Sequence, residues 1–396
     1  MSPVAADPAR RADRAAWGAV GRLLLVRLDN LGDLLMTTPA MAAVRAGLPG
    51  AHIALLASPA GAAAREHLCG IDEVIPFNAP WVKSAPDAAP EAVGVAEREL
   101  IDRLAAARFD AAIIFTVCTQ SALPAALLCR LAGIPRRLAH SRENPYALLS
   151  DWVPEPDVIQ TGMRHEVQRQ LDLVASVGFE AASRRLQWRN PPDAARRLRM
   201  RLRAHCMGQD PAYFVVHPGA TAASRRYPPE RFGQAAALIA RTSGLAAVFT
   251  GAQQEMELVE QARAAMGAPS LSLAGELPLG ELGALIDGAR LLVANNTGPV
   301  HMAAALGTPV VTLYALTNPQ HTPWGVAARV LSHDVPCRNC LRSVCPQGHH
   351  DCLARIEPPQ VAQAAIELMD ECRAAGRDLR AGQWPVAGAA ARVRPV

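Results

Sequence analysis

Lysine is almost absent from this chain of 396 residues, in which Lys83 is the single lysine and arginine supplies the other basic side chains. A Walker A loop needs glycine directly before its lysine, and Val82 stands there instead. The glycine fingerprint G-x-G-x-x-G is also missing, which weakens a dinucleotide oxidoreductase. The one His-Glu pair, His165-Glu166, is followed by Arg169 where a zincin has its second histidine, so that class of metalloprotease is excluded.

Long apolar runs are missing as well. None reaches the roughly 18–20 residues that a membrane span requires, and the first apolar run covers only 23–26. Because a signal peptide needs a longer hydrophobic region, we expect a cytoplasmic protein with a frayed start over 1–21. Nine cysteines, five of them scattered, do not form a disulfide scaffold. The net charge of +4 is too small to indicate a nucleic-acid partner.

Short apolar runs alternate with Ala/Leu-rich stretches along the first half of the chain. This alternation is typical of an α/β fold with buried parallel strands, and the length suits two or three domains of roughly 100–200 residues each. The pattern predicts strands at 23–28, 52–57, 73–77 and 111–116, and helices near 38–47, 60–69, 91–107 and 121–132.

Eight arginines and one acid fall within residues 184–203, around Pro191-Pro192, and this break in composition suits a domain boundary. A basic helix over 194–207 could contact anionic lipid headgroups or present a solvated face, which is the commoner case. Beyond Pro211 the alternation resumes and predicts a second parallel sheet. Its strands are expected at 213–217, 246–250, 270–273, 291–294, 310–314 and 329–332, and its helices at 229–242, 253–266, 279–289, 297–306 and 358–374.

The first predicted strand ends in a polar loop, 29–33, that leads into helix-forming residues. Asp33 stands at this strand-to-helix corner, where its carboxylate could act as a general base or cap the helix. Thr38-Pro39 could begin that helix or kink one that began earlier. Ligands of α/β domains usually bind beyond the carboxyl ends of the strands, which here predicts a cleft between the two sheets.

Two later strand ends carry small and polar residues that suit phosphate. The loop 217–226 offers backbone N–H groups, hydroxyls and guanidinium groups that could hold phosphate oxygens, or its arginines could be surface charges. The turn 295–301 places a helix start where a diphosphate could bind. His301, one turn inside, could face that ligand or be a buried structural histidine. Glu255 could accept hydrogen bonds from a ribose, or be only a first-turn acid of its helix.

A cluster of four cysteines falls within residues 337–352, which we call the cysteine loop. Four thiols could make a tetrahedral metal site, although the spacing is more compact than the usual zinc pattern. A disulfide pair or unbound thiols are the alternatives. The candidate ligands are Cys337, Cys340, Cys345 and Cys352.

These four sets of residues, in this order, resemble glycosyltransferase family nine, the ADP-heptose lipopolysaccharide heptosyltransferases. The similarity runs from about residue 22 to 370. Residues 27–33 and 37–39 resemble the family's opening strand, loop and helix, 217–219 and 226–228 its donor-phosphate loop, and 295–303 its signature turn. The cysteine loop is similar to that of many members of the heptosyltransferase II type.

The resemblance implies a GT-B fold, with two Rossmann-like domains whose parallel sheets face each other across a cleft. Residues 22–190 would bind the acceptor and 208–357 the nucleotide sugar, while 358–376 form a helix that crosses back to the first domain and 377–396 a flexible tail. The implied reaction is an inverting transfer of heptose from ADP-heptose to a lipid-linked saccharide of the lipopolysaccharide inner core. It needs neither metal nor cofactor, and the enzyme would work in the cytoplasm, with peripheral contact to the inner membrane.

The resemblance also implies roles for single residues. Asp33 matches the catalytic base, and Arg27 and Asn30 would bind the acceptor. The family commonly has Asp where this chain has Asn296, whose amide forms hydrogen bonds but brings no negative charge. The donor would be bound by Thr221, Ser224, Arg226, Glu255, Asn296, Thr297, Gly298 and His301.

Three other functions remain open. The first is another GT-B enzyme that uses a different nucleotide sugar, in surface polysaccharide or natural-product glycosylation or as a nucleotide-sugar epimerase. The second is a dinucleotide oxidoreductase, which the missing glycine fingerprint disfavours. The third is a metal or redox module built on the cysteine loop.

Overall fold

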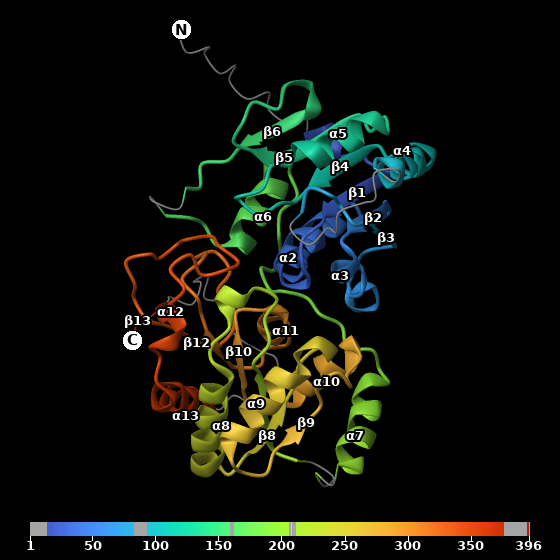
Figure 1. The fold of residues 1–396 in the computed structure, drawn as a ribbon. Helices are drawn as coiled ribbons and strands as arrows, with labels where there is room; N and C mark the ends of the chain where they lie inside the picture. The colour runs from blue at the N-terminus through green and yellow to red at the C-terminus, as the bar shows by residue number, and fades with distance from the viewer. Residues whose placement is uncertain are drawn as a thin grey trace. The chain divides into compact units, whose positions relative to one another are not determined.

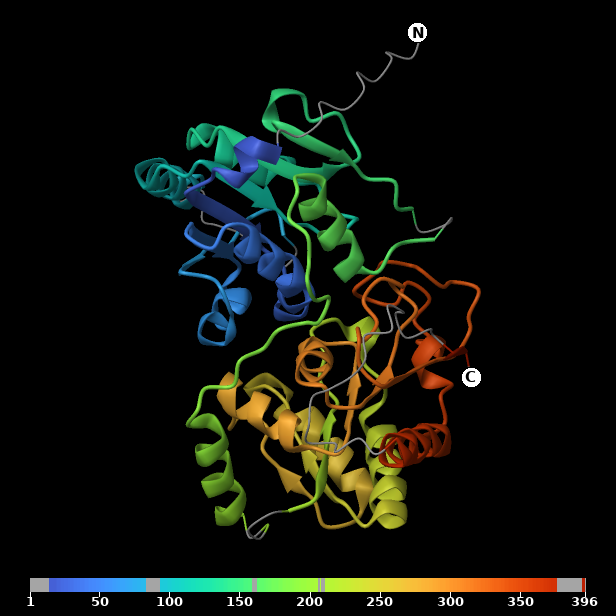
Figure 2. The same ribbon diagram turned by 180° about the vertical axis from the view of Figure 1, so that it is seen from behind.

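The structure is a computed structural model that describes residues 14–82, 93–158, 162–205, 207, 211–375 and 394–395. Its contacts divide the chain into two units, Met1–Arg184 and Arg185–Val396. Each unit is a parallel sheet with helices packed on it (Figures 1 and 2). The division falls at the start of the arginine-rich stretch 184–203. Within the described residues, no helix combines the length and the apolar character needed to cross a membrane.

Six parallel strands form the sheet of the first unit, in the order β3-β2-β1-β4-β5-β6. This is the strand order of the Rossmann fold, in which the chain reverses its direction of winding between β1 and β4. The central strands are apolar and almost fully buried, as parallel strands covered on both faces must be. The strands are β1 (Arg22–Arg27), β2 (His52–Ala57), β3 (Glu73–Pro76), β4 (Ala111–Ile114), β5 (Arg136–Ser141) and β6 (Asp151–Pro154).

Helix α2 of this unit begins earlier than the sequence predicts. It starts at Leu31 and contains Pro39, so the expected start at 38 is wrong and the alternative of an earlier helix is correct. The Thr38 hydroxyl donates to the Leu35 carbonyl inside the helix. The helices are α1 (Arg14–Gly18), α2 (Leu31–Gly47), α3 (Pro59–Ala62), α4 (Val95–Ala107), α5 (Leu123–Leu131) and α6 (Glu166–Ser176), with 3-10 turns η1 (Arg65–His67) and η3 (Tyr146–Leu148).

The predicted frayed start is wrong for the part of it that the structure describes. Trp17, on α1, is buried and packs edge-on against Phe179, with the two ring centroids 6.3 Å apart. Burial of a tryptophan and an edge-to-face ring pair both stabilise this packing, so the segment from residue 14 belongs to the folded unit. Residues 1–13 lie outside the described part of the chain.

The second unit repeats the same winding, with a sheet in the order β13-β12-β11-β10-β7-β8-β9. Here the winding reverses between β7 and β10, which pair directly. The strands are β7 (Tyr213–His217), β8 (Ala246–Phe249), β9 (Leu271–Ser272), β10 (Leu292–Asn295), β11 (Val310–Leu313), β12 (Ala328–Ser332) and β13 (Arg394–Pro395). The helices are α7 (Ala194–Ala204), α8 (Pro229–Ser243), α9 (Met256–Met266), α10 (Leu279–Gly288), α11 (Gly298–Leu306), α12 (Asp351–Ala354) and α13 (Pro358–Ala374), with 3-10 turns η4 (Ala223–Arg225) and η5 (Gln253–Glu255).

Helix α13 packs within the second unit, and the expectation that it crosses back to the first domain stays a prediction. Its apolar face, including Val361, Ala365 and Leu368, completes a core with α8 and with strands β11 and β12. Of the expected tail 377–396, the structure describes only Arg394–Pro395, which extend the sheet beside β12, and the rest lies outside the described residues.

Candidate active site

Asp33 lies at the point of the first unit where the winding reverses. Strand β1 ends at Arg27 and α2 starts four residues later, with Asn30 in extended backbone as its N-cap residue. Asp33 is therefore inside the first helical turn, where the helix dipole favours a carboxylate. It is not the capping residue, and its side chain is 18% exposed. The exposed Asn30 makes no side-chain capping hydrogen bond.

Arg27 is the cation beside this carboxylate. Its Nη2 atom lies 3.7 Å from Asp33 Oδ1 and 3.0 Å from Glu166 Oε1, and its Nε lies 3.0 Å from Asp29 Oδ2. Burial opposes the charge of the guanidinium, but the three carboxylates outweigh it and raise the pKa of Arg27. Because its side chain is 0% exposed, Arg27 does not suit the direct acceptor contact that the resemblance implies.

At Asp29 the effect of burial on the pKa is larger than the effect of the neighbouring arginine. Burial raises the pKa of the Asp29 carboxyl to about 6, and Arg27 only partly counteracts this effect. Two carboxylates therefore share one buried arginine at this strand end, one of them with a raised pKa and the other, Asp33, partly open to solvent.

Glu166 completes this cluster, and no pattern in the sequence marks it as a site residue. The pair His165-Glu166 suggests only a metalloprotease motif, and nothing in the sequence shows that residues 27 and 166 meet. In the structure α2 and α6 pack side by side, which brings Glu166 against Arg27. Figure 1 shows both helices beside the sheet of the first unit.

In the second unit, the two predicted phosphate loops follow the neighbouring strands β7 and β10. Asn295 joins them, because its Nδ2 donates to the Pro218 carbonyl at 2.7 Å and its Oδ1 accepts from the Tyr227 N–H at 3.0 Å. Asn295 is fully buried. The sequence placed it in the signature turn but gave it no role of its own, since its two partners are distant in sequence.

Glu255 and His217 lie side by side at the end of β7. The Glu255 Oε2 atom accepts from the Ala252 N–H at 2.9 Å and is 3.9 Å from His217 Nε2. A side chain at position 219 would overlap the present position of the Glu255 carboxylate, so Glu255 would have to move to another rotamer. Burial lowers the pKa of His217 despite the opposing effect of Glu255.

Ser224 is buried rather than open to a phosphate. Its hydroxyl donates to the Arg342 carbonyl at 2.7 Å, and its N–H donates to the Ser343 carbonyl at 3.0 Å. Both partners belong to the cysteine loop, so this loop is hydrogen-bonded directly to the loop 217–226. Arg226 and Thr221 remain exposed, and the Nε of Arg226 donates to the Ala220 carbonyl at 2.7 Å.

The signature turn forms the start of α11. Thr297 is its N-cap residue in extended backbone and makes no side-chain capping hydrogen bond, and Gly298 is the first helical residue. Both are half-buried, so N–H groups at a helix start lie near the surface, as an anion site needs. Asn296 and His301 are buried, and for His301 this favours the structural alternative.

The cysteine loop shows no assembled metal site. Across the described residues, no group of three or more His, Cys, Asp or Glu side chains is arranged to hold a metal ion. The four candidate thiols are free, and Cys337 Sγ lies 3.9 Å from His349 Nε2. Slight burial opposes the effect, but backbone N–H groups of residues 347–350 lower the pKa of the Cys345 thiol.

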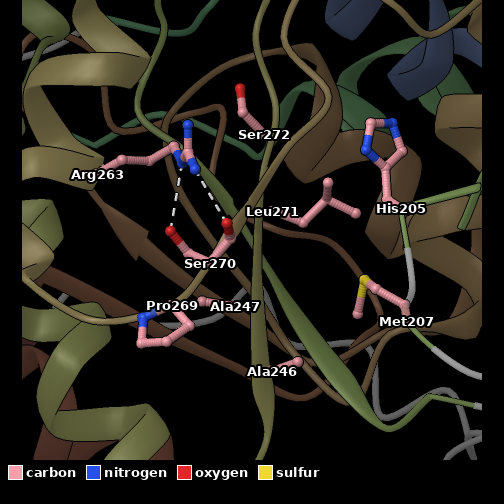
Figure 3. A pocket seen from close by; sticks show the side chains of 9 residues that line it. All are labelled: His205, Met207, Ala246, Ala247, Arg263, Pro269, Ser270, Leu271 and Ser272. Atoms are coloured by element: carbon pink, nitrogen blue, oxygen red, sulfur yellow. Dashed lines mark hydrogen bonds between the residues drawn. The ribbon is translucent and has the colours of Figure 1, made fainter.

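A surface pocket of about 540 Å³ lies elsewhere in the second unit, along β8 and the edge strand β9 (Figure 3). Arg263 reaches Ser270 through two hydrogen bonds, one to its hydroxyl and one to its carbonyl. None of the site residues predicted from the sequence lines this pocket.

A sequence model of glycosyltransferase family 9 (heptosyltransferase) matches residues 97–350, more than half of the chain. The chain belongs to glycosyltransferase family 9. Among curated relatives, lipopolysaccharide heptosyltransferase 3 of Escherichia coli is 27% identical over 301 residues, which cover 74% of this chain and 82% of that protein.

Two solved structures share the fold of this family 9 protein. A glycosyl transferase family 9 protein from Veillonella parvula aligns with a TM-score of 0.72 at 21% identity, covering 89% of this chain and 97% of that one. The ADP-heptose lps heptosyltransferase II of E. coli aligns with a TM-score of 0.65 at 22% identity, covering 89% and 99%. The predicted fold class, two Rossmann-like α/β domains of the GT-B type, is confirmed.

Proposed function

We propose that this family 9 glycosyltransferase transfers heptose from ADP-heptose to a saccharide of the lipopolysaccharide core. The observation that carries the proposal is the position of Asp33, a partly exposed carboxylate where the winding of the first sheet reverses. The family match and the relatives named as lipopolysaccharide heptosyltransferases support the donor and the acceptor class.

The proposed reaction is a single displacement that inverts the anomeric carbon. A hydroxyl of the acceptor attacks this carbon, Asp33 takes the hydroxyl proton, and ADP leaves from the opposite face. General base assistance of this kind contributes typically ~10²–10⁴ in rate. The charge that develops on the departing diphosphate needs fixed donors and cations, which the exposed Arg226 and the helix start at Thr297 and Gly298 would supply.

The test is Asp33→Asn, assayed by ADP release from ADP-heptose in the presence of a core acceptor and EDTA. We expect transfer to fall by about 10²-fold or more, whereas calorimetric titration with ADP should give an unchanged Kd. Asp102→Asn, which removes an exposed carboxylate from α4 of the same unit, is the matched control and should keep full activity. Normal turnover of Asp33→Asn would remove this residue from the mechanism.

The donor and the need for metal are tested in the same assay. A panel of nucleotide sugars should release nucleoside diphosphate at the highest kcat/KM with ADP-heptose. ADP-heptose incubated with the enzyme but without acceptor should stay unchanged. Its conversion to an epimer would instead indicate a nucleotide-sugar epimerase. Transfer that is lost in EDTA and restored by a divalent metal would contradict the proposed metal-independent reaction.

We also propose peripheral contact with an anionic membrane surface through helix α7. Arg197 and Arg201 of this helix are paired with the buried Glu281, but its other arginines, 196, 199 and 203, are exposed together with Met200. Exposed arginines beside an apolar side chain suit anionic headgroups. Co-sedimentation with vesicles that contain phosphatidylglycerol should weaken in salt and after Arg199→Glu, and binding unaffected by both changes would contradict the contact.

A further inference from the structure

We propose that Glu166 is a positioning residue for the transfer reaction: it holds Arg27 at a distance from Asp33 at which the guanidinium orients this carboxylate without closing on it. The inference rests on the proposed role of Asp33 as the base. It adds a residue on α6, 133 positions further along the chain, whose contribution acts through Arg27 and not through the substrate.

One guanidinium nitrogen of Arg27 faces both carboxylates. Its Nη2 is 3.0 Å from Glu166 Oε1, which is a hydrogen bond, and 3.7 Å from Asp33 Oδ1, which is beyond hydrogen-bond distance. The side chains of Arg27 and Glu166 are both 0% exposed, so their attraction is screened little by solvent. Glu166 is therefore the stronger partner, and Asp33 stays within ionic range only.

Glu166 is itself held firmly. Its Oε1 also accepts from Gln170 Nε2 at 2.7 Å, and its Oε2 lies 3.8 Å from Arg169 Nη1. It occupies the first turn of α6, where the helix dipole favours an acid. His165 caps this helix, since its Nδ1 accepts from the Val167 N–H. A carboxylate fixed on a capped helix can set the position of Arg27 precisely enough for catalysis.

Other charged and polar groups surround Arg27 and Glu166 and also contribute to the electrostatic field at this cluster. The Asp29 carboxylate lies 3.0 Å from Arg27 Nε and has Gln120 as a hydrogen-bond partner. Behind Glu166, Arg169 is ion-paired with Glu155. Arg169 also interacts with His140, whose pKa is lowered by burial and by this arginine, and with Cys118, whose pKa burial raises to about 11.

Removing the charge of Glu166 should make the Asp33 carboxylate a weaker base. With fewer anions around it, Arg27 is drawn toward Asp33, and the loss of a neighbouring negative charge disfavours protonation of the Asp33 carboxylate. Both effects weaken the base, the first by occupying it and the second by lowering its affinity for a proton. A purely structural ion pair would instead lower the amount of folded enzyme and leave the pH dependence alone.

The experiment is Glu166→Gln, which keeps the size of the side chain and its acceptor oxygen but removes the charge. We expect kcat to fall about 10- to 100-fold, the KM for ADP-heptose to stay within about twofold, and the acidic limb of the pH profile to move to lower pH by roughly half a unit to one unit. Carbodiimide labelling of Asp33, read by peptide mass spectrometry over pH, should move in the same direction without any substrate.

Two variants serve as controls. Glu155→Gln removes a buried charge that pairs with Arg169 in the same network but does not contact Arg27, so it should keep the wild-type acidic limb. Glu166→Asp keeps the charge and should restore the labelling profile of Asp33, with kcat recovered only in part because the side chain is shorter.

The outcomes separate this inference from the proposed function. Wild-type kcat and pH profile in Glu166→Gln would overturn the positioning role, and so would a loss of kcat with unchanged labelling of Asp33. If Asp33→Asn keeps full activity, the proposed base is wrong, whereas the labelling profile still reports whether Glu166 controls the charge at Asp33.

Discussion

Asn295 shows how much of a binding site can depend on one buried amide. Its side chain links the loops after β7 and β10 through hydrogen bonds to the Pro218 carbonyl and the Tyr227 N–H. An unsatisfied buried polar group costs about 1–3 kcal/mol. The geometry of the proposed donor site therefore depends on a residue that does not reach the surface.

We predict that Asn295→Ala destabilises the second unit by about 2–4 kcal/mol, because both hydrogen-bond partners lose their bond to this side chain, and that it weakens ADP binding about tenfold. Thermal unfolding and calorimetric titration measure the two effects. Asn144→Ala is the control, since Asn144 accepts one bond from the Tyr146 N–H in an exposed turn of the other unit. Unchanged ADP affinity in a destabilised Asn295→Ala would show that the loops keep their shape without the link.

The sequence identifies residues with unusual local surroundings more easily than it identifies their partners. Asp33 follows a strand, a polar loop and a glycine, which is a local signal, and it lies where this signal predicts. The resemblance implies an acceptor contact for Arg27, but no local pattern reveals the carboxylates from α2 and α6 beside which this side chain is buried. The resemblance likewise implies a phosphate contact for Ser224, and its hydrogen-bond partner could not be predicted because it lies 118 residues away.

Secondary-structure elements follow the same rule. Apolar strands such as β2 and β7 were predicted at their observed bounds, and so was α13. Strands β5 and β6 were missed because arginine, histidine and aspartate interrupt their apolar pattern. Helix α6 was missed because several of its buried residues are charged or polar and are satisfied by ion pairs rather than by apolar packing.

The bond between Ser224 and the cysteine loop leads to a prediction about these two elements. Ser224→Ala removes a hydroxyl that donates to the Arg342 carbonyl, so backbone hydrogen exchange across residues 337–345 should become faster, while ADP affinity should fall by less than about threefold, the worth of a modest hydrogen bond. Thr221→Ala, on the same loop but exposed, should leave exchange in the cysteine loop unchanged. A large loss of ADP affinity with unchanged exchange would instead support the direct phosphate contact that the family resemblance implies.

At the scale of the whole molecule, the chain builds the same strand order twice and places one part of the proposed chemistry in each unit. The first unit holds the base beside β1, and the second holds the loops that suit a diphosphate beside β7 and β10. Each unit also buries a histidine at a strand of its sheet, His140 on β5 and His217 on β7, and burial lowers the pKa of both.

These histidines predict that both units lose stability in acid, but to different extents. Below the ordinary histidine value of 6.5, the unfolded chain binds a proton that the folded unit resists, so stability falls with pH by up to about 1.4 kcal/mol per pH unit for each histidine. In the first unit Asp29, with its pKa raised to about 6, takes up a proton more readily when folded. Between about pH 6 and 4 this uptake offsets part of the loss from His140.

Calorimetric unfolding between pH 7 and 5 should therefore move the transition of the second unit to lower temperature by more than that of the first. His217→Asn should flatten the pH dependence of the second transition and leave the first as in the wild type, which makes the first unit an internal control. Asp29→Asn should do the opposite and steepen the first transition, since it removes the compensating proton uptake. Equal slopes in all three proteins would show that neither the buried histidine nor the buried aspartate determines acid stability.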